Sequence, residues 1–234
     1  MKVTAVPALE DNYIWFIEQG DQVIVVDPGQ GEPVLNYLKE HHLNPLAVLL
    51  THKHADHTAG VEAIKTNFPE VVVYGPTETQ DWNDRTLTPD QSFSVGDFTF
   101  KTALTAGHTA GHISYLLENH LFCGDALFMA GCGRVFTGDY AAQFAALQWF
   151  KQLPDQTFVY AGHEYSLTNL RFAQRVSPHH QPIRQALALV QDLRDQGQMT
   201  LPSTIGQEKA INPFLRANSL AEFIQLRKVR DDFS

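Results

Sequence analysis

The chain has little cysteine, no long hydrophobic run and no secretory signal. Only two of its 234 residues are cysteines, Cys123 and Cys132. One lies in an apolar run and the other among glycines, so we interpret them as thiols of a reducing compartment and not as a disulfide framework. No apolar run approaches the roughly twenty residues that a membrane span needs, and the N-terminal sequence lacks the apolar core of a signal peptide. We therefore expect a cytoplasmic protein with no membrane association.

Basic residues are also scarce. Lysine and arginine together number 17 against 26 acidic residues, and the formal net charge is −9. Because phosphate binding needs a basic footprint, this balance argues against a nucleic-acid partner. An anionic small molecule would instead need a local basic patch, and one lies near the C-terminus at Arg227, Lys228 and Arg230. A chain of this length can bury a core without metal or disulfides, so any metal is expected to be functional.

Short apolar runs alternate with helical patterns through the first two thirds of the chain. Runs rich in β-branched or aromatic residues, bounded by turn residues, predict strands at Val3–Val6, Tyr13–Ile17, Val23–Val26, Leu46–Leu50, Val71–Tyr74, Phe98–Leu104, Ile113–Leu117, Leu121–Cys123 and Phe158–Tyr160. Helical spacing predicts helices at Glu32–His41, Ala59–Phe68, Ala141–Leu153, Leu167–Val176, Ile183–Gln196 and Ser219–Val229. After about residue 165 the strand signals disappear. We therefore predict a strand-rich α/β domain over residues 1–165 and a helical domain over residues 166–234.

The segment Thr51–His57, with the sequence THKHADH, is the most informative part of the chain. It follows the predicted strand Leu46–Leu50 and precedes a helix. In extended backbone, side chains two residues apart point the same way, so His52 and His54 can bind one ion. Asp56 and His57 fall where the chain turns into the helix and can face a second ion. Imidazole nitrogen and carboxylate oxygen are ligands that zinc accepts in hydrolytic sites. A solvated polar loop is the alternative interpretation.

Three further polar residues share this placement at the C-terminal ends of predicted strands. They are His108, Asp125 and His163, and each follows a glycine, which permits close backbone approach. Each signal is weak alone, but together they supply the two histidines and one aspartate that complete two metal sites. We interpret His112 as a structural or supporting residue.

These residues resemble the metallo-β-lactamase superfamily, whose fold is an αββα sandwich with a metal site at one edge. The resemblance implies two divalent metal ions, zinc in the first place, with iron or manganese as alternatives. It implies that Asp56 orients a bridging hydroxide and that Asp125 bridges the metals and sets their spacing. The remaining ligands that it implies are His52, His54 and His108 for the first metal, and His57 and His163, with Asp56, for the second.

Within that superfamily, the chain is similar to the glyoxalase II family along nearly its whole length. The motifs that carry this similarity are PALEDNYIW, VVDPG, THKHADHTAGV, GHTAGHISY, FCGDALF, GCGR, GHEYSLTNLRFA and the terminal LRKVRDDF. The similarity implies hydrolysis of S-D-lactoylglutathione to glutathione and D-lactate, the second step of methylglyoxal detoxification. It implies a glutathione thioester as the partner molecule, and we expect a monomer.

The same resemblance implies a set of substrate contacts: Arg134, Phe136, Tyr165, Arg227 and Arg230. Arg227 and Arg230 are three residues apart, which places them on one face of the last predicted helix, as a shared carboxylate site requires. Phe136 is a departure, because the family often has tyrosine there and one hydroxyl contact is lost.

The expected chemistry follows from two cations sharing one water molecule. Their charge lowers the pKa of that water from 15.7 towards about 7, so that a hydroxide attacks the thioester carbonyl while a metal stabilises the oxyanion. Three alternatives stay open: a sulfur dioxygenase with a single iron, a lactonase or β-lactamase-type hydrolase, and a catalytically silent metal-stabilised binding module. The intact Asp56, His57 and His163 argue against the dioxygenase, and the basic helical C-terminus argues against the lactonase.

Overall fold

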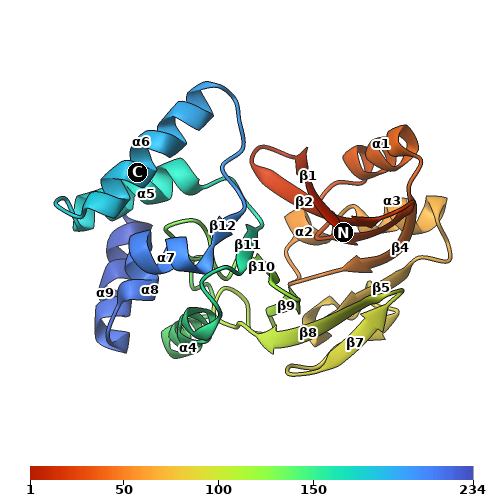
Figure 1. Ribbon diagram of the computed structural model, residues 1–234. Helices are drawn as coiled ribbons and strands as arrows, with labels where there is room; N and C mark the ends of the chain where they lie inside the picture. Colours follow the sequence, from red (N-terminus) through yellow and green to blue (C-terminus); the bar gives the residue numbers. More distant parts are fainter. Residues whose placement is uncertain (234) are drawn as a thin grey trace. The chain divides into compact units, whose positions relative to one another are not determined.

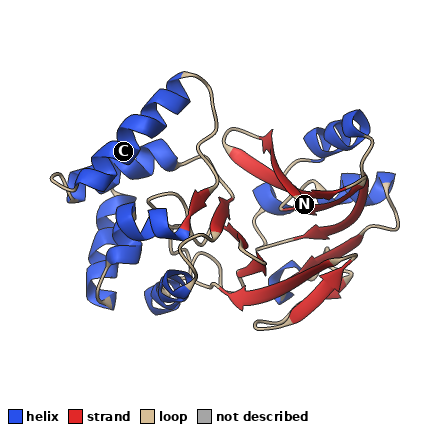
Figure 2. Cartoon of the chain, viewed as in Figure 1, coloured by secondary structure: helices blue, strands red, loops and turns tan. Residues whose placement is uncertain are grey.

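The computed structural model describes residues 1–233, which form two compact units (Figure 1). Unit 1 comprises Met1–Leu104 and Gly111–Glu118. Unit 2 comprises Thr105–Ala110 and the chain from Asn119 onward. Most strands belong to unit 1 and the longest helices to unit 2 (Figure 2).

Unit 1 contains a mixed six-stranded sheet with the strand order β1-β2-β3-β4-β5-β6. The first three strands pair antiparallel, and the last three continue the sheet in parallel. Parallel neighbours need crossover connections, and helices α1 (Gly31–His41) and α3 (Val61–Asn67) provide them. The strands are β1 (Lys2–Ala8), β2 (Asn12–Gln19), β3 (Gln22–Val26), β4 (Asn44–Leu49), β5 (Val72–Gly75) and β6 (Arg85–Thr86).

One face of this sheet packs against α1 and α3. Successive side chains of a strand point to opposite faces, so alternate residues such as Ile14 and Phe16 contribute to one cluster. Val34 and Leu38 of α1 and Ile64 of α3 complete it, and all of these side chains are buried. Burial of these apolar side chains holds helices α1 and α3 against the sheet.

The other face of the sheet is covered by an antiparallel meander of β7 (Ser92–Val95), β8 (Phe98–Leu104) and β9 (Ile113–Leu117). The rings of Tyr74 and Phe93 stack with centroids 5.1 Å apart. The buried Tyr115 hydroxyl donates a hydrogen bond of 2.6 Å to the Leu50 carbonyl oxygen. Unit 1 therefore has the helix–sheet–sheet layering that the predicted sandwich requires. Its two shortest helical segments are α2 (Ala55–Thr58) and η1 (Thr77–Thr79).

Unit 2 is built from three strands and six helices among the described residues. Strand β10 (His120–Gly124) pairs in parallel with β11 (Phe158–Ala161), which pairs antiparallel with β12 (Ser203–Thr204). Phe172 and Phe214 stack at 5.8 Å in its core. The helices are α4 (Tyr140–Gln152), α5 (Ser166–Val176), α6 (Gln181–Asp195), α7 (Ile205–Ile211), α8 (Pro213–Arg216) and α9 (Leu220–Asp231). No described helix is long and apolar enough to cross a membrane.

All nine predicted strands and all six predicted helices are present, with ends shifted by a few residues. The expectation that strands end at about residue 165 is wrong in one place, because β12 lies at Ser203–Thr204. Other short elements were also not predicted, since segments of two to seven residues are too short to show a period: β6, β7, β12, α2, η1, α7 and α8. The predicted division into functional domains at residue 165 stays a prediction.

A buried carboxylic acid lies among the helices of unit 2. Glu208 on α7 is fully buried, and its Oε2 accepts hydrogen bonds from the Ala130 amide (2.8 Å) and the Asn212 side-chain amide (3.0 Å). Desolvation raises the pKa of Glu208 to about 7, although hydrogen bonds from Ser203, Asn212 and Ala130 act to lower it. The folded protein therefore holds this proton more tightly than the unfolded chain.

This burial predicts a pH-dependent stability difference between the protein and Glu208→Gln. Below pH 4.5, the ordinary carboxyl pKa, the group is protonated in both states. As pH rises towards 7, only the unfolded state ionises, so the free energy of unfolding falls relative to the glutamine variant. Between pH 4.5 and 7, we expect the free energy of unfolding of the variant to rise by about 2–3 kcal/mol relative to that of the unaltered chain. Urea unfolding of both proteins at matched metal content measures it, and a difference that does not change with pH would contradict it.

Candidate metal centre

His52 and His54 come together directly after β4, as their spacing predicts. His52 is fully buried, and its Nε2 lies 3.0 Å from Nδ1 of His54. The Thr51 hydroxyl donates its proton to Asp27 (2.7 Å). It can therefore only accept from His52 Nδ1, 3.0 Å away. This fixes the His52 tautomer and leaves a lone pair on Nε2, the nitrogen that faces His54.

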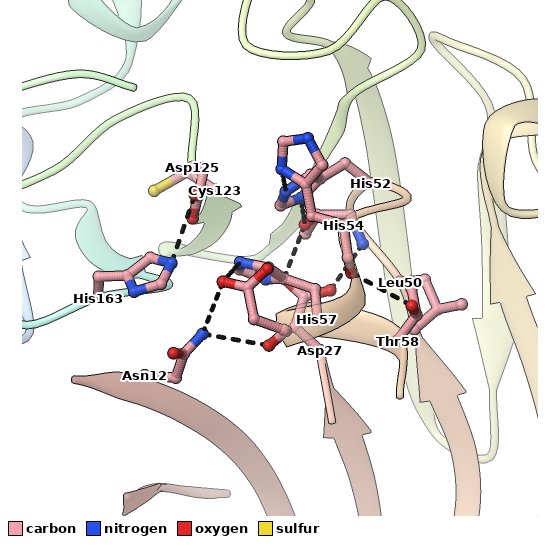
Figure 3. A network of polar contacts seen from close by, with 12 residues as sticks. Asn12, Asp27, Leu50, His52, His54, His57, Thr58, Cys123, Asp125 and His163 are labelled. Atoms are coloured by element: carbon pink, nitrogen blue, oxygen red, sulfur yellow. Dashed lines mark hydrogen bonds and ion pairs between the residues drawn. The ribbon is translucent and has the colours of Figure 1, made fainter. Parts of the chain in front are cut away.

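Asp27, which we had not predicted as a site residue, lies beneath this pair (Figure 3). Its buried carboxylate accepts the Thr51 amide at 2.7 Å, and His57 Nδ1–H donates to its Oδ2 at 3.0 Å. His57 Nε2 then carries the lone pair and lies 3.6 Å from Asp56. A carboxylate that orients a histidine through its far nitrogen is a usual support for a metal ligand. The only hint in the sequence was the turn Asp27-Pro28-Gly29 after a buried strand.

Asp56 lies in the first turn of α2 with 38% of its side chain exposed, and Asn12 holds it. The buried Asn12 side-chain amide donates to the Asp56 carbonyl oxygen (3.1 Å) and to its Oδ2 (3.2 Å). Figure 3 shows two dashed lines leaving the Asn12 side chain. These two hydrogen bonds fix the position of the Asp56 carboxylate.

In unit 2, two histidines meet one carboxylate oxygen. His108 Nε2 and His163 Nε2 each lie 3.4 Å from Oδ2 of Asp125, and all three residues are buried. His108 Nδ1 lies 2.9 Å from the Arg134 carbonyl oxygen, which can only accept, so His108 Nε2 carries a lone pair. A lone pair facing a carboxylate oxygen is favourable only with a cation or a proton between them. These residues come from the ends of β8 and β10 and from the turn after β11, as predicted.

The donor atoms of both units fit a divalent metal. In unit 1, His52 and His57 each present an Nε2 lone pair, because Thr51 and Asp27 fix the Nδ1 atoms of the two rings. In unit 2, two imidazole nitrogens converge on one oxygen of Asp125. Nitrogen and oxygen donors with their far atoms hydrogen-bonded are what zinc, iron or manganese sites use. His112, interpreted as structural, is fully buried and stacks on His52 with centroids 5.0 Å apart.

Two predicted substrate residues lie beside the predicted ligands of unit 2. The Tyr165 ring stacks on His163, with centroids 4.7 Å apart and planes 5° from parallel. Phe136 is 63% exposed and meets His108 edge-on at 5.3 Å. An exposed aromatic ring next to a polar cluster is available to contact a ligand.

The three predicted basic contacts differ in burial. The Arg134 side chain is 54% exposed and lies 3.3 Å from Asp231. Arg227 is buried and donates to the Cys132 carbonyl oxygen (2.7 Å) and to Asp231 (2.9 Å). Arg230 donates to Asn169 and to the Phe233 carbonyl oxygen, and its partial burial beside Arg227 lowers the pKa of its guanidinium. Arg134 is therefore the basic side chain of the three with the most solvent access.

Comparison with known proteins agrees with this geometry. The sequence model of the "Metallo-beta-lactamase superfamily" matches residues 9–163, and that of the "Hydroxyacylglutathione hydrolase C-terminus" matches residues 164–233. Among solved structures, ETHE1 from Myxococcus xanthus is similar with a TM-score of 0.75 and 27% identity, over 97% of this chain and 90% of that one. The BLEG-1 B3 metallo-beta-lactamase gives 0.72 and 27%, over 92% of this chain and 100% of that one. The chain thus has the metallo-β-lactamase fold and belongs to that superfamily, as predicted.

Two curated relatives show which family within the superfamily the chain belongs to. The hydroxyacylglutathione hydrolase of Haemophilus ducreyi is 49% identical over 234 residues, and that of Glaesserella parasuis is 50% identical, each covering 100% of both chains. The chain belongs to the hydroxyacylglutathione hydrolase family, also called glyoxalase II.

Proposed function

We propose that the chain hydrolyses the thioester of S-D-lactoylglutathione to glutathione and D-lactate, the second step of methylglyoxal detoxification. The observation that carries this proposal is the single Asp125 oxygen approached by two imidazole nitrogens at 3.4 Å. The full-length similarity to hydroxyacylglutathione hydrolases supports the choice of substrate. It also favours this activity over the sulfur dioxygenase, the lactonase and the silent binding module.

The proposed centre contains two divalent metal ions. Zinc is the preferred metal, and iron and manganese are the alternatives. Asp125 would hold both ions, with His52, His54 and His108 as the other residues of the first site and Asp56, His57 and His163 as those of the second. The metals, when bound, supply a hydroxide nucleophile at neutral pH and Lewis acidity towards the thioester carbonyl.

The chain's own residues hold that centre. Asn12 fixes the Asp56 carboxylate, which would orient the hydroxide that the metals supply. Asp27 and the Arg134 carbonyl oxygen keep the protons of His57 and His108 on Nδ1, so that Nε2 stays free as a donor. Since a thiolate is a good leaving group, no strong general acid is required.

Residues 166–234 are proposed to bind substrate, and residues 1–165 to perform the chemistry. The substrate contacts are proposed to be Arg134, Phe136, Tyr165, Arg227 and Arg230. An acidic chain can hold an anionic tripeptide only through such a local group of basic side chains. A cytoplasmic monomer is part of the same proposal.

Turnover of S-D-lactoylglutathione with parallel metal analysis tests the proposal. We expect about two metal ions per chain, loss of turnover on chelation and its return on adding zinc. Because imidazole must be deprotonated to bind metal, affinity should weaken below about pH 6.5. A metal-loaded protein that leaves the thioester intact would refute the function.

A further inference from the structure

The loop formed by residues 126–134 carries no predicted metal ligand, yet side chains from the helices of unit 2 bind much of its backbone. It follows Asp125 at the end of β10. Phe128 and Gly131 exchange two backbone hydrogen bonds of 3.0 Å across a tight turn. Ala130, within that turn, has a φ of 53°, a left-handed conformation that is unfavourable for alanine. Something other than local preference must hold the turn.

Glu208 and Asn212 hold it from α7 and its C-terminal end. Glu208 Oε2 accepts the Ala130 amide at 2.8 Å. The Asn212 side-chain amide donates to the Gly131 carbonyl oxygen at 2.9 Å and to Glu208 at 3.0 Å. Glu208 and Asn212 are both fully buried. Buried groups of this kind, bonded to each other and to backbone, are rigid supports.

The far end of the loop reaches the proposed ligands. A Cβ on Gly133 would overlap the Asp125 carbonyl oxygen and would lie 2.8 Å from His108 Nδ1, so the loop backbone is pressed against both residues. One residue later, the Arg134 carbonyl oxygen accepts the proton of His108 Nδ1 at 2.9 Å. The position of that oxygen fixes the imidazole and keeps Nε2 directed at Asp125.

We propose that Glu208 and Asn212 are positioning residues for the metal centre, because they fix the 126–134 loop so that the Arg134 carbonyl oxygen orients His108. They act through the loop backbone and touch neither metal nor substrate. The inference rests on the proposed function only in taking His108 as a metal ligand.

The test compares Glu208→Ala, Glu208→Gln and Asn212→Ser in zinc-loaded full-length protein. Serine can still cap α8, where the Asn212 Oδ1 accepts the amides of Phe214 and Leu215, but it lacks the donating amide arm. In Glu208→Ala and Asn212→Ser we expect faster hydrogen exchange in residues 128–134, with β11 unchanged. Zinc affinity, measured by competition with a chelator, should weaken about tenfold, the effect of losing a residue that supports a ligand. Glu208→Gln keeps an acceptor for Ala130 and should restore both.

Thr204→Ala is the matched control. Thr204 caps α7 through the Gln207 amide (3.2 Å) and does not bond to the loop, so its loss weakens the same helix without releasing the turn. Unchanged loop exchange and zinc affinity in both Glu208→Ala and Asn212→Ser would overturn the inference. So would the same changes in Thr204→Ala, or failure of Glu208→Gln to restore them. If Glu208→Ala does not fold, the loop exchange and zinc affinity of Asn212→Ser alone test the inference. The exchange and zinc readouts need no turnover, so they remain decisive even if the unaltered protein fails to hydrolyse S-D-lactoylglutathione.

Discussion

Asp125→Asn is expected to lower the turnover of S-D-lactoylglutathione by about a hundredfold or more and to leave fewer than two metals per chain. Asparagine is nearly isosteric with aspartate, but it is neutral and places an N–H₂ group where one carboxylate oxygen stood. In this structure that oxygen lies 3.4 Å from two imidazole nitrogens. A bound metal would supply the nucleophile and stabilise the oxyanion, and losing one group that stabilises an oxyanion typically costs about 10²–10³ in kcat. Because Asp125 is proposed to serve both ions, metal content and turnover should fall together.

Elemental analysis and steady-state kinetics on the same preparation make this measurement. Asp97→Asn is the control, since it makes the same chemical change at an exposed position between β7 and β8. Far-ultraviolet circular dichroism checks that both variants keep the fold. If Asp125→Asn retains two metals and nearly normal turnover, Asp125 is not the bridging ligand.

The fold could be predicted from the sequence because its strands are short, apolar and separated by turn residues. From Ala47 to Leu50 the run Leu46–Leu50 is buried on both faces and therefore shows no alternation, but its length and its position before the THKHADH segment identify it as a strand. Helices α7 and α8 could not be predicted in this way, since neither exceeds seven residues. Glu208 and Asn212, which hold the 126–134 loop, lie on or beside those two helices. The sequence therefore indicates the candidate ligands but not the residues that support them.

The candidate ligands could be predicted because strand ends bring them together. His52 and His54 need only extended backbone to meet, and they do, at 3.0 Å. Asp27 and Asn12 escaped prediction because their roles depend on contacts 30 and 44 residues away along the chain. Sequence spacing carries no information about such pairs. Sequence spacing also could not show that Arg227 is buried, because a spacing of three residues places Arg227 and Arg230 on one helix face without saying what that face contacts.

The burial of Arg227 separates two roles for the basic residues of unit 2. Arg227 holds the Cys132 carbonyl oxygen and Asp231, and its guanidinium lies 5.2 Å from the centre of the Phe214 ring. Its loss leaves a buried acceptor and a carboxylate without their partner, which destabilises a protein. The Arg134 side chain is largely exposed to solvent, while its carbonyl oxygen accepts the hydrogen bond that orients His108. Replacing the Arg134 side chain leaves that oxygen in place.

Arg134→Ala combined with Arg230→Ala is therefore expected to raise KM for S-D-lactoylglutathione about tenfold or more, with a smaller fall in kcat. Charge-assisted contacts to a carboxylate contribute about 1.5–3 kcal/mol each when shielded from water and less at an exposed side chain. A short thioester without the glutathione carboxylates should show almost no change, because the lost contacts are remote from the reacting bond. Two metals should stay bound. Arg227→Ala should impair turnover of both substrates and lower the urea midpoint of unfolding, because this buried side chain also holds the Cys132 carbonyl oxygen and Asp231.

Arg171→Ala, which removes an equal charge from an exposed position on α5, is the control for a general change of surface potential. Kinetics with both thioesters on all four proteins, including the unaltered chain, separate recognition from chemistry. Equal losses with both substrates in the Arg134/Arg230 variant, or no loss with either, would show that these side chains do not hold the glutathione carboxylates. The substrate assignment would then rest on the relatives alone, while the metal centre would be unaffected, because none of its proposed ligands lies beyond His163.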